Sequence, residues 1–473
     1  MEILHVSAEC YPASKAGGLA DVVGALPKYQ NQLGHLAKVV TPMHRTKFLY
    51  DNDFEVVHKG DFKMGGSMWF PYTIIKEKTN KLGFDFYMVD ILGLLDRERI
   101  YGYDDDTERF MAFQIAVADW ISKWEIAPDV VHVHDHHTAM LPFMMKYCYA
   151  YKHLAGVKTV LTIHNAQYQG WMSWQKISYM PAWDSNNWGK LDWNGDVNPL
   201  ACGIRCVDKV TTVSQSYLEE IKHTAKGLEA LFEYERGKCV GVLNGIDSVV
   251  WDSATDDYLD YKFSIKNNKE GKFENKRILC ERFNLDINKP LFIFIGRMVY
   301  EKAADLLPQA INDAIYHMKG EMNFLILGSG DYYLEKHFEN MRGEFVGYYN
   351  SHIGYNEKLS HEMYAGADFL LMPSRVEPCG LNQMYSMRYG TVPIVRNTGG
   401  LRDTVIDYGD PGGYGIRFND ATVWDITYSI YRALELYKQP KRFDEVRKTM
   451  MKLDNSWESS ASKYIELYRQ LSN

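Results

Sequence analysis

The sequence has few cysteines, no long hydrophobic run and no excess of positive charge. Its seven cysteines are dispersed along 473 residues, and no two have the CxxC spacing of a zinc site. We therefore interpret them as free thiols in a reducing cytoplasm. No apolar run approaches the roughly 18 residues of a membrane span, and the first six residues lack the basic and apolar regions of a secretory signal. These absences predict a cytoplasmic protein with no membrane partner.

The charge balance is acidic, with 53 Lys and Arg against 61 Asp and Glu and a net charge of -8. This balance argues against nucleic acid as the main partner, because neutralising phosphates requires clustered Lys and Arg. Hydrophobic residues make up 46% and charged residues 24%, as in ordinary globular proteins. At about 100–200 residues per domain, the length predicts two domains, or three.

Short apolar runs rich in β-branched residues alternate with helical stretches in both halves of the chain. Such runs predict parallel strands that are covered on both faces of a sheet. The strands predicted in the first half are Ile3–Val6, Ala37–Thr41, Val130–Val133, Thr159–Ile163 and Val210–Val213. Those in the second half are Leu291–Ile295, Phe324–Leu327, Phe369–Met372 and Val392–Val395. Two such sets predict an α/β fold with two doubly wound domains.

The break between the domains is expected near Gly245, which gives domains of residues 1–245 and 246–456. The polar stretch Lys262–Lys276 reads as a surface segment. The C-terminal segment Trp457–Leu471 carries its apolar residues on one helical face, so we expect it to pack on one of the domains.

Two turns with paired glycines follow predicted strands. One runs from Lys15 to Asp21, and the other begins at Thr398 and continues with Gly399 and Gly400. Glycines let backbone N–H groups approach an anion, and a helix start adds positive potential. Each turn fits either an anion cradle or an ordinary connection between a strand and a helix.

Two further strand ends carry charged side chains. Arg297 and Lys302 follow one strand and suit a diphosphate group, although a solvated basic loop has the same appearance. Glu377 follows another strand and precedes a turn, Cys379–Leu381, whose N–H groups suit sugar hydroxyls or phosphate. The alternative is a carboxylate favoured by a helix start. Ligands of open α/β sheets bind at the carboxyl ends of strands, so these are candidate binding residues.

Histidines gather at two strand ends. His132, His134 and His136 have the period-2 spacing of one strand face, which fits a zinc site or a polar cluster that contacts a polar ligand. We favour the polar cluster and expect no metal. His164 follows the strand Thr159–Ile163 and either donates to a substrate or has a structural role.

Two other patterns have less specific meanings. Asp104-Asp105-Asp106 contains the DxD pattern of metal-dependent sugar-nucleotide transferases, but it does not end an apolar strand and reads as an acidic loop. Five tryptophans between Trp171 and Trp193 fit either core packing or a platform for carbohydrate.

Taken in order, these motifs resemble the bacterial glycogen synthase and plant starch synthase family of retaining GT-B glycosyltransferases. The resemblance covers nearly the whole chain and rests on collinear motifs. They are Lys15-Ala16-Gly17-Gly18-Leu19-Ala20-Asp21-Val22, Thr162-Ile163-His164-Asn165, Val242-Leu243-Asn244-Gly245-Ile246-Asp247, Glu377-Pro378-Cys379-Gly380-Leu381 and Thr398-Gly399-Gly400-Leu401.

The resemblance implies two Rossmann-like domains that face each other across a cleft. The N-terminal domain, with the last helix (457–473) crossing back to it, would bind the glucan acceptor, and the C-terminal domain the nucleotide sugar. The implied reaction transfers glucose from ADP-glucose to the non-reducing end of an α-1,4-glucan with retention of configuration. The expected partners are therefore a nucleotide sugar and an α-glucan polymer. The oligomeric state cannot be read from the sequence.

The resemblance also assigns roles to individual residues. The implied catalytic residues are Glu377, Lys15, Arg297, Lys302 and His164. The implied donor-binding residues are Gly18, Asp21, Asn244, Tyr355, Cys379, Gly380, Leu381, Thr398 and Gly399. The implied acceptor-binding residues are Asp135 and His137. No metal and no cofactor are implied, because cationic side chains and helix N-termini stabilise the leaving diphosphate.

Some positions depart from the family pattern. The usual Gln-Lys-Gly-Leu-Asp is Glu301-Lys302-Ala303-Ala304-Asp305 here, and the usual His-Asp-Trp-His is His134-Asp135-His136-His137. These changes indicate a divergent branch of the family. Two other interpretations stay open: a GT-B transferase that uses UDP-glucose or another nucleotide sugar, and an inactive glucan-binding homologue.

Overall fold

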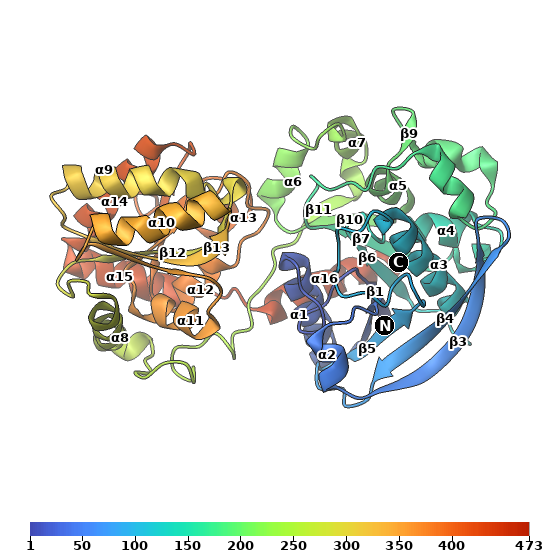
Figure 1. Ribbon diagram of the computed structural model, residues 1–473, viewed down its shortest axis with the longest axis horizontal. Coiled ribbons are helices and arrows are strands. Elements are labelled where there is room, and N and C mark those ends of the chain that lie inside the picture. The colour runs from blue at the N-terminus through green and yellow to red at the C-terminus, as the bar shows by residue number, and fades with distance from the viewer. Residues whose placement is uncertain (473) are drawn as a thin grey trace. The chain divides into compact units, whose positions relative to one another are not determined.

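The computed structural model describes residues 1–472, and its internal contacts divide the chain into two units. The first unit contains Met1–Asn244 and the C-terminal segment that starts at Trp457, and the second is Gly245–Ser456. Each unit is an α/β structure built on one large sheet (Figure 1).

The first unit contains a nine-stranded sheet with the first strand of the chain in its interior. Its strands, in spatial order, are β11 (Cys239–Gly241), β10 (Lys209–Thr212), β7 (Lys158–Ile163), β6 (Val130–His134), β1 (Glu2–Val6), β2 (Leu36–Pro42), β5 (Asp85–Asp90), β4 (Met68–Glu77) and β3 (Phe54–Met64). All neighbours from β11 to β5 are parallel, as predicted. The last two strands form an antiparallel hairpin at one edge, which the sequence did not predict.

Helices cover this sheet (Figure 1). They are α1 (Gly18–Gln32), α2 (Lys47–Asp51), α3 (Asp106–Ser122), α4 (Leu141–Tyr147), α5 (Pro199–Cys206), α6 (Gln215–Ile221), α7 (Glu229–Tyr234) and α16 (Trp457–Ser472). A small separate sheet pairs β8 (Asp192–Trp193) with β9 (Asp196–Val197).

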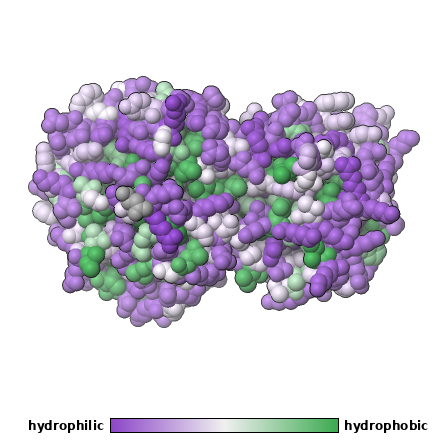
Figure 2. Space-filling view, turned by 180° about the vertical axis from the view of Figure 1, so that it is seen from behind, coloured by the Kyte–Doolittle hydropathy of each residue, from purple (hydrophilic) through white to green (hydrophobic). Residues whose placement is uncertain are grey.

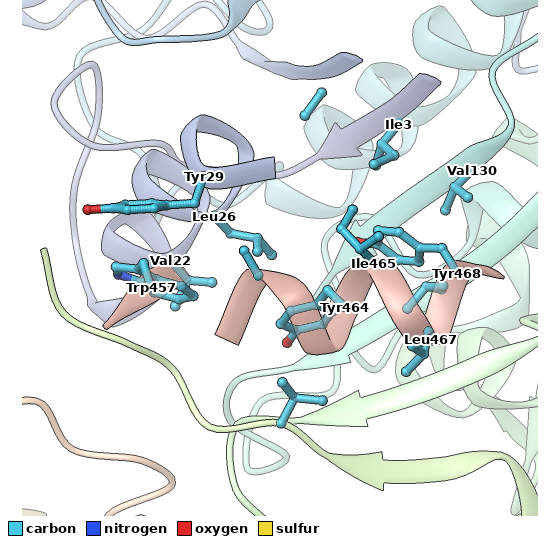
Figure 3. Packing of buried hydrophobic residues seen from close by; sticks show 14 residues of the cluster. Ile3, Val22, Leu26, Tyr29, Val130, Trp457, Tyr464, Ile465, Leu467 and Tyr468 are labelled. Carbon is cyan, nitrogen blue, oxygen red and sulfur yellow. The ribbon is translucent and has the colours of Figure 1, made fainter. Parts of the chain in front are cut away.

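The C-terminal helix α16 returns to the first unit, as the family resemblance implies. Trp457, Tyr464, Ile465 and Tyr468 lie on the face of α16 that packs against α1 and the start of β1 and β6 (Figure 3). All four side chains are buried. Burying a large apolar side chain contributes roughly 1.5–3 kcal/mol, so this seam fixes the helix firmly to the sheet.

The second unit contains a six-stranded sheet in which every neighbouring pair is parallel. Its strands, in spatial order, are β14 (Tyr349–Ile353), β13 (Asn323–Gly330), β12 (Leu291–Met298), β15 (Phe369–Met372), β16 (Val392–Arg396) and β17 (Ile416–Phe418). The first strand of the unit, β12, lies beside the fourth, which is the order of dinucleotide-binding Rossmann folds. The strand order reverses between β12 and β15, and ligands of such sheets bind at the carboxyl ends of the strands at this switch point.

One helix of this unit shows that the predicted surface segment Lys262–Lys276 was wrong. The helices are α8 (Asn268–Phe283), α9 (Leu307–His317), α10 (Tyr332–Glu344), α11 (Glu357–Gly366), α12 (Asn382–Arg388), α13 (Gly399–Thr404), α14 (Val423–Tyr437) and α15 (Pro440–Met451). The stretch Lys262–Lys276 is not a surface segment, because Lys272 and Lys276 of α8 are buried. The Lys272 ammonium donates to three backbone carbonyls and to Thr391, and the Lys276 ammonium pairs with Asp368 at 2.8 Å.

No helix within residues 1–472 has both the length and the apolar character needed to cross a bilayer. Polar residues cover most of the face shown in Figure 2, with hydrophobic residues in small patches between them. All seven cysteines are free thiols, as predicted, and six of them are buried.

Candidate active site

The carboxyl ends of β12 and β15 bring a lysine and a glutamate into contact in the second unit. The Lys302 Nζ atom lies 2.8 and 2.6 Å from Oε1 and Oε2 of Glu377. The Ser374 hydroxyl donates to the same carboxylate at 2.8 Å. The Glu377 side chain is 7% exposed and the Lys302 side chain 24%. The switch point of the sheet therefore holds a buried carboxylate and a more accessible ammonium group.

Arg375 holds the turn that carries this lysine. Its guanidinium forms a two-pronged ion pair with Asp305 at 2.6 and 2.9 Å and donates to the carbonyl of Tyr300 at 2.7 Å. The Arg375 backbone N–H also donates to the carbonyl of Glu301 at 2.8 Å. Because the accepting residues flank Lys302, these bonds fasten the turn after β12 to the turn after β15.

The segment that follows Glu377 packs directly against the start of α13. Gly399, the first residue of α13, has φ +47°, and a Cβ there would lie 2.0 Å from the Glu377 carbonyl oxygen. Only glycine allows this close approach. Gly380 has φ +75°, and the backbone N–H groups of Gly380 and Leu381 donate to no acceptor within the described residues 1–472. These two donors lie in the turn directly after the buried carboxylate.

Other predicted donor-site residues lie around this turn. Cys379 is buried, and its carbonyl accepts a hydrogen bond from the Gln383 side chain at 3.0 Å. Thr398 is buried and immediately precedes α13. Arg297 lies at the carboxyl end of β12 with a 66% exposed side chain and pairs loosely with Glu301 at 3.6 Å.

Tyr355 lies in the loop after β14, two strands away from β12 in the sheet. It is 84% exposed, and its hydroxyl donates to the Glu357 carboxylate. Both Tyr355 and Arg297 are thus accessible side chains at the carboxyl edge of the same sheet.

In the first unit, the glycine turn after β1 binds a carboxylate of its own chain. The backbone N–H groups of Ala16 and Gly17 donate to Oε2 of Glu9, and the Tyr101 hydroxyl donates to Oε1 at 2.8 Å. Burial raises the pKa of Glu9, although these hydrogen bonds oppose the rise. At Ala16 and Gly17 the turn therefore serves an internal carboxylate and not an external anion.

Lys15 and Asp21 form an ion pair across this turn, with 2.7 Å between Nζ and Oδ1. Their side chains are 46% and 29% exposed. Gly18 begins α1 and is exposed, and a Cβ there would meet no atom within 4 Å. The cation that the sequence singled out is therefore on the surface and accessible to a ligand.

His164 and Asp135 meet at the carboxyl ends of β7 and β6. The Asp135 carboxylate accepts the backbone N–H of His164 at 2.7 Å and that of Asn165 at 3.4 Å. Burial raises the pKa of Asp135 to about 7, against the effect of these two donors. Burial lowers the pKa of His164 to about 3, so its ring is neutral at physiological pH.

His137 and Asn244 each have a buried polar atom that lacks a protein partner. Within residues 1–472, no hydrogen bond reaches Nδ1 of His137 or Oδ1 of Asn244. The His137 ring stacks on Tyr101, with 4.7 Å between ring centroids. An unsatisfied buried polar atom costs roughly 1–3 kcal/mol, which a hydrogen bond to a ligand or water would recover.

Three buried histidines, His5, His132 and His134, have ligand atoms within 4.8 Å of one another. His136 is not in this cluster, because β6 ends at His134 and Asp135 takes φ +57°, which breaks the strand alternation. Hydrogen bonds account for all six ring nitrogens of the three histidines. A metal would have to displace these bonds, so the geometry favours a polar cluster over a zinc site.

Sequence reasoning missed several residues that shape both sites. They are Glu9, Tyr101 and His5 in the first unit and Ser374 and Arg375 in the second. Tyr101 reaches Glu9 from 92 residues away, a pairing that no local pattern announces. Ser374 and Arg375 directly follow the predicted strand Phe369–Met372, but the contact between Arg375 and Asp305 depends on the adjacency of β12 and β15.

Comparison with known proteins identifies the family of the chain. Models of two families match the chain, a starch synthase catalytic domain over residues 2–234 and glycosyl transferases group 1 over residues 276–450. A glycogen synthase of Flavobacterium johnsoniae is 52% identical over 468 residues, which cover 99% of this chain and 98% of that protein. The chain belongs to the glycogen and starch synthase family. A glycogen synthase of Streptococcus pneumoniae is 36% identical over an alignment of 487 residues that covers 100% of both proteins.

Solved structures place the fold in the same group of enzymes. The catalytic domain of starch synthase IV from Arabidopsis thaliana, bound to ADP and acarbose, matches with a TM-score of 0.88 and 31% identity over 99% of both chains. A sucrose-phosphate synthase from Thermosynechococcus elongatus, at 16% identity, matches in fold with a TM-score of 0.63. The predicted GT-B fold is confirmed, and the protein is a retaining glycosyltransferase of the glycogen and starch synthase family.

One departure from the family pattern has a visible structural consequence. Ala303, which stands where the family usually has glycine, is buried and has φ +54°. Alanine therefore adopts the left-handed conformation that glycine enters without a steric penalty. The turn after Lys302 keeps the shape that glycine favours, so this departure does not remove the lysine from its place beside Glu377.

Proposed function

We propose that this protein is a glycogen synthase that transfers glucose from ADP-glucose to the non-reducing end of an α-1,4-glucan, with retention of configuration. The observation that carries the proposal is the Lys302–Glu377 pair at the switch point of a Rossmann-type sheet. A cation, a buried carboxylate and unoccupied N–H donors at one strand edge suit a nucleotide sugar. The ADP bound to the Arabidopsis relative supports the nucleoside diphosphate, and the acarbose bound there supports the glucan.

The donor diphosphate is assigned to the cationic side chains. Arg297 is exposed and can bind it through two donors, while Lys302 supplies a point charge that its bond to Glu377 already orients. Thr398 and Gly399 add contacts at the start of α13. The family resemblance assigns Lys15, Gly18 and Asp21 to the donor as well, and the surface position of Lys15 suits this role.

The glucosyl group is assigned to the turn after β15. The Glu377 carboxylate accepts hydrogen bonds from sugar hydroxyls, and the N–H groups of Gly380 and Leu381 donate to oxygen atoms of the donor. Cys379 contributes its backbone to the same turn. Tyr355 provides an exposed aromatic ring for stacking against the base. The family resemblance assigns His164 and Asn244 to the donor sugar as well, and Oδ1 of Asn244 is an unsatisfied acceptor.

The chemistry breaks the bond between glucose C1 and the diphosphate oxygen and forms a bond from C1 to an acceptor hydroxyl oxygen. Both bonds lie on the same face of the sugar, so the configuration is retained. The proton of the acceptor hydroxyl passes to the departing diphosphate. Negative charge grows on that diphosphate as the bond breaks, and Arg297 and Lys302 stabilise it. We propose that the reaction needs no metal, since these cations supply the required positive charge.

The acceptor glucan is assigned to Asp135 and His137. Sugar hydroxyls both donate and accept, and these residues provide a carboxyl group and an unsatisfied ring nitrogen. A cytoplasmic location is part of the same proposal, and the seven free thiols support it.

The test is incorporation of labelled glucose into glycogen by the purified protein. ADP-glucose and UDP-glucose are supplied side by side over a range of concentrations, with EDTA present and absent, and Glu377→Gln serves as the blank. The proposal expects incorporation from ADP-glucose that the blank lacks and EDTA does not change. Incorporation only from UDP-glucose would keep the mechanism and overturn the donor assignment. No incorporation from either donor would overturn the synthase activity and favour the glucan-binding homologue.

A further inference from the structure

A continuous chain of buried side chains joins the C-terminal helix to His164 inside the first unit. The Tyr468 hydroxyl of α16 lies 3.2 Å from Nε2 of Gln30, whose Oε1 lies 2.8 Å from Nε2 of His5. Nδ1 of His5 lies 3.1 Å from Nε2 of His134, and Nδ1 of His134 lies 3.0 Å from Nε2 of His164. Figure 3 shows Tyr468 on the inward face of α16, among the residues that cover this sheet.

The register of the sheet explains why three histidines line up. His5 pairs with His132 across β1 and β6, and His134 pairs with Thr162 across β6 and β7. These side chains therefore project from one face of the sheet. On the same face, nearer the amino ends of the strands, Ile3 and Val130 form the apolar core under α16. The face thus changes from apolar to polar toward the carboxyl edge, where His164 lies.

The three histidines of this hydrogen-bonded series, His5, His134 and His164, are neutral. Burial lowers the pKa of His5 to about 4 and that of His164 to about 3, and it holds the pKa of His134 well below the ordinary value. A neutral imidazole has one donor nitrogen and one acceptor nitrogen. In a chain of neutral rings, the direction of one hydrogen bond therefore fixes the direction of all the others.

Gln30 sets that direction. Its Oε1 atom faces His5 and can only accept, so Nε2 of His5 carries the proton and Nδ1 is the acceptor. Nε2 of His134 must then donate to His5, and Nε2 of His164 must donate to His134. This leaves Nδ1 of His164 unprotonated with a free lone pair, and the hydrogen bonds given for His164 within residues 1–472 involve its Nε2 atom and its backbone N–H only.

We propose that Gln30, His5 and His134 are positioning residues that hold His164 in the tautomer with Nε2 protonated, so that Nδ1 accepts a hydrogen bond from a sugar hydroxyl. The proposal rests on the proposed function for the identity of that sugar. Asp135 complements the chain, because it fixes the backbone N–H of His164 at 2.7 Å while the other histidines fix the ring. His164 is therefore an acceptor toward substrate and not a donor.

The direct test is the tautomer of His164, read from ring nitrogen chemical shifts in the full-length protein labelled with ¹⁵N-histidine. The signals are assigned by their loss in His164→Gln. The proposal expects a protonated Nε2 and an unprotonated Nδ1 at His164, unchanged between pH 6 and pH 8. A protonated Nδ1 would mean that the chain runs in the opposite direction, and it would overturn the proposal. This measurement needs no activity, so it stays decisive even if the protein transfers no glucose.

Variants of the chain test its effect on catalysis. Gln30→Met removes the group that sets the direction, and His5→Phe keeps an aromatic ring in the stack while breaking the chain. We expect each to lower kcat by about 10–100-fold through misorientation of His164, with the KM for ADP-glucose much less affected. Each should also give a mixture of His164 tautomers, which a merely structural role would not produce.

Thr211→Val is the matched control. Thr211 is buried on the same sheet face and bonds Thr162 at 2.6 Å, on a branch that runs through His132 to the Tyr468 hydroxyl, at the far end of the chain from His164. We expect it to keep the kcat and the His164 tautomer of the unmodified protein. Equal losses in Thr211→Val and Gln30→Met, with an unchanged tautomer in both, would show that only packing matters and would contradict the proposal.

Discussion

Lys302 and Glu377 are 75 residues apart in the chain and form an ion pair of 2.6 Å. Each follows one of the two adjacent strands between which the sheet order reverses. Ser374 and the clamp from Arg375 to Asp305 surround the pair and leave the ammonium group partly exposed. The surrounding residues therefore hold the pair in place at the switch point, and the assignment of the donor site rests on this pair.

Removing either charge of this pair should abolish transfer without unfolding the protein. We expect Glu377→Gln and Lys302→Met each to lower kcat/KM for ADP-glucose by about 10²–10³-fold, because each removes a group that stabilises the transition state. The double variant should lose little more than the worse single variant, since the two groups act as a unit. Additive losses would mean that they act independently.

The ion pair between Arg375 and Asp305, which holds the turn that carries Lys302, gives a second prediction. Arg375→Lys keeps the charge but loses the two-pronged bond to Asp305, so the turn after β12 should shift. We expect kcat/KM for ADP-glucose to fall by about tenfold. Arg282→Lys is the matched control, because Arg282 forms a similar two-pronged pair with Glu362 between α8 and α11. A comparable fall in the control would show that the effect is on stability alone.

Close packing at the start of α13 gives a third prediction. Gly399→Ala should displace the Glu377 carbonyl, which would lie 2.0 Å from the new Cβ, and should lower kcat by about 100-fold or more. Gly412→Ala has a similar positive φ, +73°, but its Cβ meets nothing within 4 Å. The control should lose about 1 kcal/mol of stability and keep its activity. Full activity in Gly399→Ala would contradict the described packing.

Acid should destabilise the first unit more than the second. Burial lowers the pKa values of seven histidines of the first unit, of which His136 and His137 are half-buried and the others buried: His5, His44, His132, His134, His136, His137 and His164. Each stays neutral when folded but takes up a proton when unfolded below its ordinary pKa of about 6.5. These histidines therefore leave the free energy of unfolding unchanged above about pH 6.5. Below that pH, each of them lowers it by up to about 1.4 kcal/mol per pH unit.

Three carboxyl groups of the first unit oppose this trend, since burial raises the pKa of Glu9, Asp90 and Asp135. They are outnumbered by the histidines. In the second unit, burial lowers the pKa of His361, but its bonds to Asp256 and Glu357 outweigh burial and raise it. That group stabilises the fold most below pH 6.5 and loses its effect as the pH rises.

Hydrogen exchange resolved by peptide checks the pH prediction. Between pH 7 and pH 5, after correction for the intrinsic exchange rate, protection should fall in β6 and β7 and hold or rise in α11. Equal loss of protection in both units would contradict the assigned protonation states.

The sequence predicted nine of the parallel strands, which are mostly buried apolar runs, but it did not predict β5, β11, β14 or β17. Phe369–Met372 matches β15 residue for residue, and the other predicted strands differ from the observed ones only at their ends. The sequence did not predict the hairpin of β3 and β4 because its two strands expose many side chains and mix polar with apolar residues. The order of the strands, which places Lys302 beside Glu377, depends on long-range pairing that no local pattern records.

The buried lysines show another limit of sequence reasoning. A polar stretch rich in Lys normally faces water, so Lys262–Lys276 read as surface. Lys272 is buried because backbone carbonyls from three separate residues surround its ammonium, and Lys276 is buried because Asp368 neutralises it. The site has a similar case, since Glu9 occupies the N–H groups of a turn that the sequence alone cannot distinguish from a ligand cradle.

The most direct test of the account is the affinity of the protein for ADP, measured by titration calorimetry on the unmodified protein and on Lys302→Met. The account predicts that the unmodified protein binds ADP and that Lys302→Met binds it at least about tenfold more weakly, because a charge-assisted contact to the diphosphate is worth roughly 1.5–3 kcal/mol. The Arg282→Lys control should bind like the unmodified protein. Equal affinity in Lys302→Met and the unmodified protein would show that the diphosphate does not bind at the β12–β15 switch point.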